Sequence, residues 1–503
     1  FAFELVEKFF WQYWGQLGID RDRFIGLAAQ DLPWGPQYSM TVLALRLSAF
    51  ANGVSKLHGE VSRDMWQFLW PDTPVAQVPI GHITNGVHTK TWLAGELRAL
   101  YSKYLAADWL EEVDAPETWQ AIDQIPDAEL WAVHQQRKAL MVAEMRKRVQ
   151  RQYLRYGEGP RRLHEAAELL DPHALTLGFA RRFATYKRAT LIFQDEERLL
   201  KILNHPERPV QIVFSGKAHP ADEPGKGLIQ HIYQLSQRPE FSGKILFVEN
   251  YDMNIARHLV AGVDVWLNNP RRPHEASGTS GQKAALCGSP NFSVLDGWWV
   301  EGYNGENGWS IGEERAYKDE ATQDEADVQH LYTTLEEEIV PLFYTRDAAG
   351  IPTGWIEKMK NAIRTCAPTF SMRRMVKEYT ECYYLPAATM GNAFADDHYA
   401  NARALATWKS QIHQRWQALH LQAESQGQGQ IVVGEALPIR ARLWLNGVDS
   451  QEVAVELVVG TQNGTNELVN PLVVPMNRMG EENGALIFEG TITPKDSGML
   501  NVG

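Results

Sequence analysis

The sequence predicts an α/β protein built on a doubly wound parallel sheet, with a small antiparallel β domain near its carboxyl end. Two patterns lead to this fold class. Between residues 174 and 267, four short apolar runs alternate with helical stretches, as buried parallel strands joined by helices do. Beyond residue 431, alternating apolar and polar residues are separated by Asn-Gly turn signals, which are typical of antiparallel hairpins.

The first 170 residues predict helices interrupted by one loop. An aromatic-rich helix comes first, a second helical run covers roughly 40–57, and 79–92 has the composition of a loop. Residues 93–170 are mostly helical, and Ala, Met, Gln, Arg and Glu dominate the long stretch 131–156. Because these residues favour helices, we expect one long helix there.

The four apolar runs are the expected strands of the sheet, at 175–180, 210–214, 244–248 and 263–267. Ligands of such sheets bind at the carboxyl ends of the strands, so the residues directly after each run are the first candidates for a site. Helical periodicity returns over 355–422. The stretch 426–430, Gln-Gly-Gln-Gly-Gln, then predicts a linker before the β region 431–503.

Composition excludes several classes of protein. A chain of 503 residues that is 44% hydrophobic can bury several cores without disulfides or metal. The formal net charge of −13 argues against a nucleic-acid binder, which needs a basic surface. Three scattered cysteines fit a reducing, cytoplasmic compartment, and no apolar run is long enough to span a membrane. Neither end resembles a natural terminus, so we expect a fragment of a longer protein.

A basic cluster follows the first expected strand. Arg181, Arg182, Lys187 and Arg188 place four cations within eight residues of an acidic chain. Such a group could hold a phosphate by charge-assisted hydrogen bonds. The ordinary alternative is a solvated helix face, and position alone leaves the two interpretations evenly balanced.

A second cluster follows the fourth strand. Ser277, Gly278 and Thr279 come before a short helix near 284–286, and small residues at a helix start favour anion binding. Glu275 could accept hydrogen bonds from sugar hydroxyls, and Lys283, expected in the first helical turn, is a candidate Schiff-base residue for pyridoxal phosphate. Spacing alone favours an ordinary Gly/Ser loop with a surface lysine.

Three further residues are weaker candidates. Tyr251, after the third strand, could cover an aromatic cofactor, although a core tyrosine is commoner. Asn85 could bind a sugar or sit in a plain Asn-Gly turn, and His58 could be catalytic or structural. The standard nucleotide-binding patterns, Walker A and G-x-G-x-x-G, do not occur in the sequence.

Taken together, these segments resemble the glycogen/α-glucan phosphorylases, pyridoxal-phosphate-dependent retaining glycosyltransferases of the GT-B fold. The tryptophan-rich sequence from Asp296 to Tyr303 is similar to that of the bacterial branch of the family. The motifs occur in the order and spacing of the family: Asn52-Gly53-Val54 with His58, Thr84-Asn85-Gly86 with Trp92, Tyr186-Lys187-Arg188, Gly216-Lys217-Ala218, Glu249-Asn250-Tyr251, Glu275 to Lys283, and Leu295-Asp296-Gly297 to Glu301.

The resemblance implies phosphorolysis of α-1,4-glucan by inorganic phosphate to α-glucose 1-phosphate with retention, with the phosphate of pyridoxal 5'-phosphate relaying a proton. It also implies that the protein could form a homo-oligomer. It assigns 1–92 to the end of an amino-terminal GT-B domain and 93–425 to the cofactor-binding domain. Residues 431–503 have no counterpart in the classical short phosphorylases, and their own pattern predicts a truncated, sandwich-like accessory β domain. The implied site residues are Arg181, Arg182 and Lys187 for catalysis; Lys283, Thr279, Gly278 and Tyr251 for the cofactor; and Glu275, Ser277, Asn85 and Tyr186 for the sugar.

Two other functions stay open at this point. A nucleotide-sugar-dependent glucan synthase would share the fold and a basic phosphate site, but would not need Lys283 as a cofactor attachment point. A non-catalytic glucan-binding protein could retain the fold alone. We also expect that the fragment could be inactive by itself, because the amino-terminal domain of the family is largely outside it.

Overall fold

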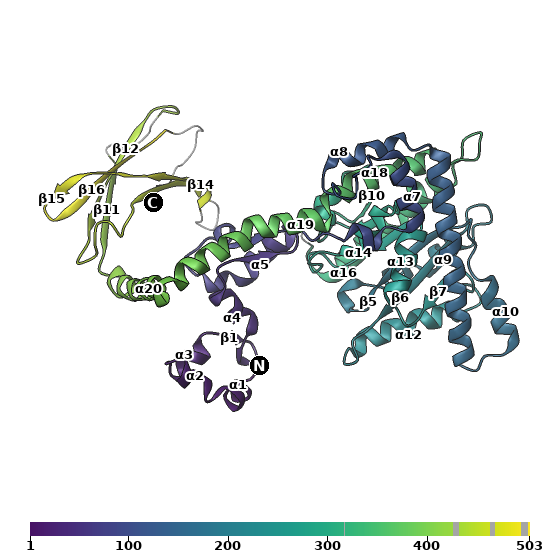
Figure 1. Ribbon diagram of the computed structural model, residues 1–503, viewed down its shortest axis with the longest axis horizontal. Helices are drawn as coiled ribbons and strands as arrows, with labels where there is room; N and C mark the ends of the chain where they lie inside the picture. Colours follow the sequence, from purple (N-terminus) through teal and green to yellow (C-terminus); the bar gives the residue numbers. More distant parts are fainter. Residues whose placement is uncertain (316, 426–431, 463–467, 494–500, 503) are drawn as a thin grey trace. The chain divides into compact units, whose positions relative to one another are not determined.

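A six-stranded parallel sheet organises the first of two units, Phe1–Leu385 and Pro386–Gly503, into which the chain divides. The structure is a computed structural model, and it describes residues 1–315, 317–425, 432–462, 468–493 and 501–502 (Figure 1). The strand order is β10-β9-β8-β5-β6-β7. The strands are β5 (Leu175–Arg182), β6 (Val210–Lys217), β7 (Ile245–Val248), β8 (Val265–Asn268), β9 (Asn291–Val294) and β10 (Gly308–Ile311).

The strand order reverses between β5 and β8, which are neighbours in the sheet although β6 and β7 lie between them in sequence. This is the order of a doubly wound sheet, in which ligands bind at the carboxyl ends of the strands where the order reverses. The four strands expected from sequence are confirmed. The strands β9 and β10 extend the sheet beyond the expected four.

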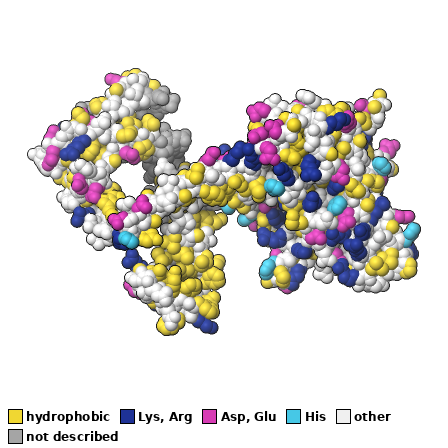
Figure 2. Space-filling view, in the orientation of Figure 1, with side chains coloured by type: hydrophobic (Ala, Val, Ile, Leu, Met, Phe, Trp, Pro, Cys, Tyr) yellow, Lys and Arg dark blue, Asp and Glu magenta, His cyan; other side chains and the backbone are white. Residues whose placement is uncertain are grey.

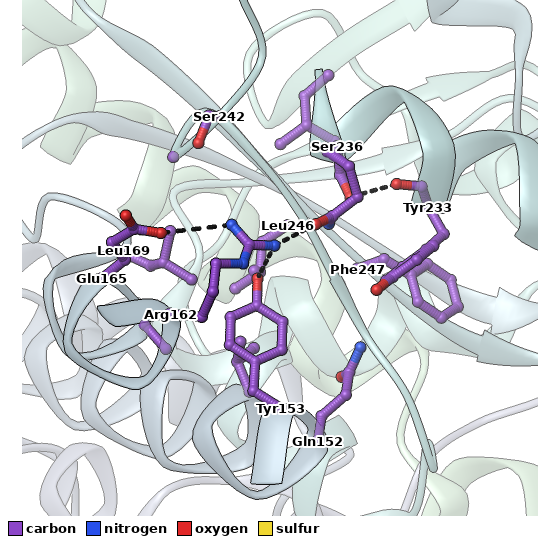
Figure 3. Close-up of a pocket in the computed structure, with 15 residues that line it drawn as sticks. Gln152, Tyr153, Arg162, Glu165, Leu169, Tyr233, Ser236, Ser242, Leu246 and Phe247 are labelled. Atoms are coloured by element: carbon purple, nitrogen blue, oxygen red, sulfur yellow. Dashed lines mark hydrogen bonds and ion pairs between the residues drawn. The ribbon is translucent and has the colours of Figure 1, made fainter. Parts of the chain in front are cut away.

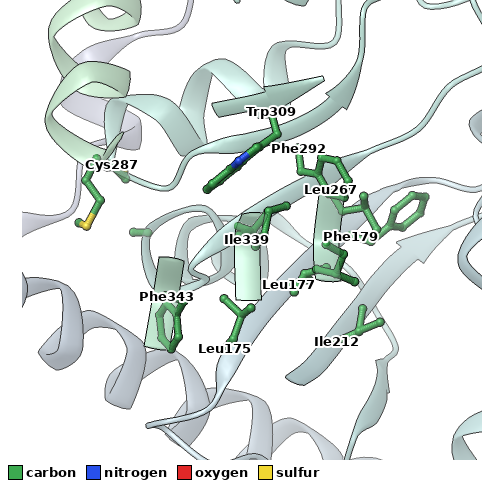
Figure 4. Close-up of a cluster of buried hydrophobic side chains, with 14 of the residues drawn as sticks. Leu175, Leu177, Phe179, Ile212, Leu267, Cys287, Phe292, Trp309, Ile339 and Phe343 are labelled. Atoms are coloured by element: carbon green, nitrogen blue, oxygen red, sulfur yellow. The ribbon is translucent and has the colours of Figure 1, made fainter. Parts of the chain in front are cut away.

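Both faces of the sheet are buried, as the apolar runs predict. Leu175, Leu177 and Phe179 of β5 lie in one core (Figure 4), whereas Ala180 lies in the other. The first core includes apolar side chains of α12, α16 and α18, and the second includes side chains of α9 and α13. These helices are α9 (Asp127–Arg155), α12 (Glu223–Gln237), α13 (Met253–Gly262), α16 (Glu320–Thr334) and α18 (Thr353–Thr369).

The long helix expected over 131–156 is confirmed as α9. It starts after Pro126 with two acidic residues in its first turn, which complement the helix dipole. Other helices of this unit are α7 (Gly95–Tyr104), α8 (Pro116–Gln120), α10 (Pro160–Glu168), α11 (Glu196–Leu203), α14 (Thr279–Leu286), α15 (Trp299–Gly302), α17 (Val340–Tyr344) and α19 (Met372–Tyr379).

The helix expected over roughly 40–57 is wrong, because two helices and a strand occupy this stretch. Ser39 caps the first helix, and Ser55 caps the second by accepting the His58 amide at 3.1 Å. Between them, a Cβ on Gly53 would lie 2.4 Å from the Gly59 amide nitrogen, so the chain turns back closely there. The elements are α4 (Met40–Leu47), β3 (Ala51–Gly53) and α5 (Lys56–Trp66).

The rest of the amino-terminal segment holds short elements around a small core. Within the expected loop 79–92, a short strand pairs in parallel with β3 and a short helix follows it. Hydrophobic side chains gather on the surface of α1–α4 (Figure 2), and Phe9 and Trp34 are among the exposed ones. The elements are α1 (Phe3–Phe10), α2 (Tyr13–Gln16), α3 (Arg21–Gly26), β1 (Ala29–Leu32), β2 (Gly35–Tyr38), β4 (Ile80–His82) and α6 (Thr89–Trp92).

The second unit contains two antiparallel sheets, ordered β11-β12-β16-β15 and β14-β13-β17. Side chains of both sheets share one core, which includes Ile439, Leu457 and Phe488. The small antiparallel β domain is therefore confirmed. The strands are β11 (His420–Ser425), β12 (Leu437–Trp444), β13 (Glu456–Gln462), β14 (Leu468–Pro475), β15 (Asn477–Glu482), β16 (Ala485–Ile492) and β17 (Asn501–Val502).

Several local expectations for this unit meet different outcomes. The Asn483-Gly484 turn is confirmed, since both residues have positive φ and join β15 to β16. Helical structure ends with α20 (Leu385–Trp416), which is broken at 396–399, rather than at residue 422. The expected linker 426–430 and the Asn463-Gly464 turn lie outside the described residues. Among the described helices, none is long and apolar enough to cross a bilayer.

Candidate functional site

The loops after β5 and β8 bring the two candidate clusters together at the point where the strand order reverses. Arg181, near the end of β5, is buried and donates from Nη2 to the Leu267 carbonyl of β8 at 2.8 Å. The amide of Arg271 donates to the Tyr186 carbonyl at 2.7 Å. These bonds hold the basic loop of β5 against the loop of β8 that carries Glu275.

An ion pair joins the two loops directly. The Lys187 ammonium contacts Glu275 Oε2, and each residue is only 8% exposed. Lys187 lies on the short 3₁₀ turn Thr185–Lys187 that follows β5. The two charges are buried and neutralise each other. An anion bound here would therefore compete with Glu275 for the Lys187 ammonium, and a sugar would compete with Lys187 for the Glu275 carboxylate.

Arg181 interacts electrostatically with three other predicted site residues, Glu275, Tyr251 and Tyr186. Burial lowers the pKa of Arg181 to about 10, while Glu275, Tyr251 and Tyr186 act on it in the opposite direction. Burial also raises the pKa of Tyr251, and Arg181 opposes that change. The pKa of Arg181 stays far enough above neutrality for its guanidinium to remain charged.

The other two arginines of the basic cluster, Arg188 and Arg182, differ in burial and in the partners of their side chains. Arg188 is 5% exposed and pairs with Asp324 and Asp327, each at 2.7 Å. It also donates to two backbone carbonyls of the β8 loop, so its role is structural. Arg182 is exposed at the end of β5, and its side chain makes no ion pair or hydrogen bond within the described part of the chain, which leaves its guanidinium available to an anion.

Helix α14 presents its amino-terminal end at the same place. The N-cap position of this eight-residue helix is Gly278, with φ +84°. Because glycine has no side chain, the N-cap residue does not cap the first amides of the helix. Thr279 is its first residue and Lys283 its fifth. The expectation that Lys283 lies in the first turn is therefore wrong, because the helix starts at Thr279, before the apolar residues 284–286 from which it was predicted.

Lys283 has the properties of an amine that could carry a carbonyl cofactor. Its Nζ lies 3.7 Å from the centre of the Trp92 ring, and burial lowers its pKa. No carboxylate pairs with it among the residues that the structure describes. A lowered pKa increases the fraction of neutral amine, the form that reacts with an aldehyde. These features fit pyridoxal phosphate, with the uncapped start of α14 nearby for an anion.

Buried polar atoms without partners gather around these loops. They include Arg181 Nε, Ser277 Oγ, Asn269 Oδ1 and Gln282 Oε1. Such atoms are rare in folded proteins because each costs free energy when desolvated. Their concentration at this edge of the sheet is expected of a site that binds polar ligands.

Asn85 reaches the site from the amino-terminal segment. Its amide donates to the Val54 carbonyl at 3.0 Å, and its carbonyl accepts from Gln282 Nε2 of α14 at 2.8 Å. No described hydrogen bond uses its side-chain amide. His58 is turned inward instead, since its Nδ1 accepts the Val54 amide at 3.1 Å and burial lowers its pKa.

Sequence reasoning gave no role to Asp296, Ser55 or Glu301, although these residues hold the site in place. Asp296 is fully buried and accepts the amides of Glu275 and Gly297. Burial raises the pKa of Asp296 to about 7. The motif Leu295-Asp296-Gly297 to Glu301 was the signal in the sequence, and it does not reveal that Asp296 binds a residue 21 positions upstream.

Two cavities were compared with this neighbourhood. One, of about 80 Å³, lies beside the edge strand β7, where Arg162 donates to Tyr153 Oη at 3.4 Å (Figure 3). It contains none of the predicted site residues. Another, of about 520 Å³, is lined by Arg271, Arg272 and His274, the residues just before Glu275. No cluster of described His, Cys, Asp or Glu side chains could hold a metal.

Comparison with known proteins identifies the family of this chain. Residues 6–340 match the carbohydrate phosphorylase family, and residues 416–503 match the glycogen phosphorylase C-terminal domain. A maltodextrin phosphorylase of Thermococcus litoralis is 42% identical over 91% of this chain and 53% of its own length. A glycogen phosphorylase of Mycobacterium tuberculosis H37Rv is 39% identical over 95% of this chain and 55% of its own.

A glycogen phosphorylase of Aquifex aeolicus is 44% identical over 76% of this chain and 55% of its own length. The chain thus spans about half the length of the curated relatives that it matches. With the match at residues 6–340 and this level of identity, the chain belongs to the carbohydrate phosphorylase family.

Proposed function

We propose that this chain is the cofactor-binding part of an α-glucan phosphorylase of the GT-B fold, which cleaves α-1,4-glucan with inorganic phosphate. The observation that carries the proposal is the meeting of Arg181, Lys187 and Glu275 at the reversal of strand order. The half-buried Lys283 lies on α14, the helix that begins just after Gly278 in the same loop. Family membership supplies the reaction class, and the site supplies residues suited to it.

Lys283 is the proposed attachment point of pyridoxal 5'-phosphate, with Gly278 and Thr279 at the helix start and Tyr251 beside the ring. When bound, this cofactor would supply a phosphate group that exchanges a proton with the attacking inorganic phosphate. The lowered pKa of Lys283 favours its attachment.

The basic side chains would hold the phosphates. Arg182, which is exposed and unpaired in the described chain, and Arg181, which is buried beside it, would attract an anion to the end of β5. Lys187 would add a third cation once it leaves Glu275. Three cations stabilise the charge that gathers when two phosphates lie close together.

The sugar would occupy the side of the site that carries acceptors. Glu275, released by Lys187, would accept hydrogen bonds from glucosyl hydroxyls. Ser277 Oγ lacks a partner in the described residues and would bond the same unit, together with the Asn85 amide and Tyr186. A glycosidase would need a pair of flanking carboxylates. The predominance of cations here instead suits a phosphate nucleophile.

The wider assignments remain part of this proposal. Residues 1–92 would be the end of an amino-terminal GT-B domain, 93–425 the cofactor-binding domain and 431–503 an accessory β domain. We expect a cytoplasmic enzyme that acts on α-glucan and phosphate, binds no nucleic acid or membrane, and could form homo-oligomers.

Cofactor attachment can be tested without measuring turnover. The chain is incubated with pyridoxal phosphate, reduced with borohydride and digested, and the modified peptide is identified by mass spectrometry. We expect the label on Lys283 and its loss in Lys283→Ala. Lys201→Ala is a matched control, because Lys201 is an exposed lysine of α11, outside the candidate site. Absence of label from Lys283 would refute the cofactor assignment.

Turnover is tested on this chain and on the protein expressed from its full open reading frame. Release of glucose 1-phosphate from maltodextrin and phosphate is expected, and Lys283→Ala should abolish it while keeping the circular dichroism spectrum. Transfer from a nucleotide sugar, without phosphorolysis, would favour a glucan synthase. Labelling of Lys283 with neither reaction would favour a non-catalytic glucan-binding protein.

A further inference from the structure

The loop that carries Glu275 and Ser277 is held by three hydrogen bonds to its backbone, one for each of residues 275–277. The amide of Glu275 donates to Asp296 Oδ2 at 2.9 Å. The carbonyl of Ala276 accepts from Ser55 Oγ at 2.7 Å, and the carbonyl of Ser277 accepts from the Trp298 amide at 2.8 Å. Each backbone tie therefore fixes one residue of the loop.

Two of these three ties come from one tight turn, residues 296–298. Asp296 Oδ1 accepts the Gly297 amide at 2.8 Å, so its two carboxylate oxygens join the turn to the loop. Gly297 has φ +54°, and a Cβ there would lie 2.4 Å from the Ser277 carbonyl oxygen. The turn and the loop are thus in direct backbone contact, which only glycine allows at this position.

The third tie comes from Ser55 in the amino-terminal segment, and the stretch after Asp296 contacts that segment as well. Ser55 is fully buried and caps α5. Glu301, five residues after Asp296, accepts the Lys56 amide at 2.8 Å and the Thr84 hydroxyl at 2.8 and 2.9 Å. Thr84 precedes Asn85. The stretch 296–301 therefore contacts both the Glu275 loop and the segment that presents Asn85.

We propose that Asp296 is a positioning residue, whose carboxylate sets the place of Glu275 and Ser277 toward the sugar and thereby supports the reaction. This inference rests on the proposed function for its catalytic part. Asp296 itself lies behind the loop, with both oxygens occupied by backbone amides, so it acts through Glu275 and Ser277.

A carboxylate is needed because both donors are amides. An ionised carboxyl accepts two N–H bonds at once, whereas an amide side chain offers one oxygen and one donating nitrogen. Burial raises the pKa of Asp296 to about 7 and the Glu275 charge adds to this, while the two amides and Arg272 oppose it. Asp296→Asn keeps the shape and must leave one backbone amide facing another donor.

The test uses Asp296→Asn in the full-length protein, with Asp195→Asn as matched control. Asp195 also accepts a backbone amide, that of Arg198 at 3.0 Å, but it caps α11 away from the site. We expect kcat for phosphorolysis to fall about 10- to 100-fold in Asp296→Asn, the equivalent of one charge-assisted hydrogen bond. Amide hydrogen exchange should rise in peptides covering 273–282 and 295–299, and nowhere else.

A second variant covers the case in which Asp296→Asn does not fold. Gly297→Ala keeps the carboxylate but places a methyl group against the Ser277 carbonyl, so it should reproduce the local exchange and the fall in kcat. Wild-type kcat and wild-type exchange in both variants would overturn the proposal. So would a uniform rise of exchange across the unit with kcat unchanged, because that pattern belongs to a purely structural residue.

Failure of the proposed function looks different. If the wild-type protein carries out no phosphorolysis, the reaction class is wrong. The exchange measurement then still decides whether Asp296 positions the loop, since it needs neither substrate nor turnover.

Discussion

Replacing Lys138 by methionine should strongly destabilise the first unit, because Lys138 belongs to a buried charge network beneath the parallel sheet. Its Nζ lies 2.5 Å from Asp264 Oδ2 and 2.6 Å from the Ala174 carbonyl. Asp264 also accepts from His134 at 2.7 Å and from the Thr176 amide at 2.7 Å. The side chains of Lys138 and Asp264 are completely buried.

The expected loss follows from what the variant leaves behind. Methionine fills a similar volume, so the cavity term is small. Asp264 would keep His134 and Thr176 but lose the cation that its carboxylate contacts directly. Breaking a buried ion pair by removing one partner costs about 3–5 kcal/mol. Since two donors remain, we expect a loss near 3 kcal/mol, out of a total stability of about 5–15 kcal/mol.

The assay is urea unfolding at pH 7.5, followed by tryptophan fluorescence, with the midpoints compared at equal slope. The control is Lys201→Met, the same substitution at an exposed i,i+4 pair with Glu197, where no measurable shift of the midpoint is expected. A destabilisation below about 1 kcal/mol for Lys138→Met would refute the reasoning, because the network would then contribute no more than a surface pair.

The pH dependence of the same variant gives an independent check. Burial alone would raise the pKa of Asp264, but Lys138 and His134 hold it below its usual range. The stability that this carboxylate contributes is thus present above a pH of about 4, its ordinary pKa, and is lost as the pH falls through the lower folded value. Lys138→Met removes the main cause of the lowering, so the gap in stability between variant and wild type should narrow on acidification.

Three further outcomes are expected. Arg188→Met should lower the free energy of unfolding by about 3–5 kcal/mol, because it leaves Asp327 buried without its partner; equal urea midpoints would contradict this. Gly297→Ala should cost about 1–3 kcal/mol through strain and backbone contact, clearly more than Gly350→Ala, where φ is also positive but no atom lies near the new methyl group. In the native protein a thiol reagent should modify only Cys382, the exposed cysteine, since burial raises the pKa of the other two thiols to about 11 and about 12; rapid modification of a second cysteine would show that the buried thiols are reached.

Strand periodicity predicted β5–β8, including the edge strand β7, but it missed β9 and β10 on the opposite side of the sheet. The runs that became β5–β8 are apolar throughout, because both faces are buried. Strand β9 was missed since it carries Asn291 and Ser293. These polar side chains are buried but satisfied by distant partners: Asn291 donates to the Gly281 carbonyl, and Ser293 accepts from Asn268. Local sequence does not contain that information.

The candidate site shows the same division between local and distant information. Position at strand ends was enough to select Arg181, Lys187 and Glu275, which the fold brings together. The four cations nevertheless looked equivalent in sequence, whereas Arg188 pairs with carboxylates 136 and 139 residues away. Asp296 belongs to a motif recognised in the sequence, but it received no role there, because its partners are backbone amides that no side-chain pattern encodes.

The amino-terminal segment docks onto later parts of the chain, so this docking must wait during biosynthesis until those parts have been made. The Val87 amide donates to the Phe370 carbonyl, and the Met372 amide donates to the Val87 carbonyl. A ribosome that adds about 5–20 residues per second needs roughly 15–60 s to synthesise the intervening chain. During that interval Phe370 and Met372 do not exist, so Val87 cannot form these two hydrogen bonds. The segment around Val87 can therefore dock in its final place only after residue 372 has been synthesised.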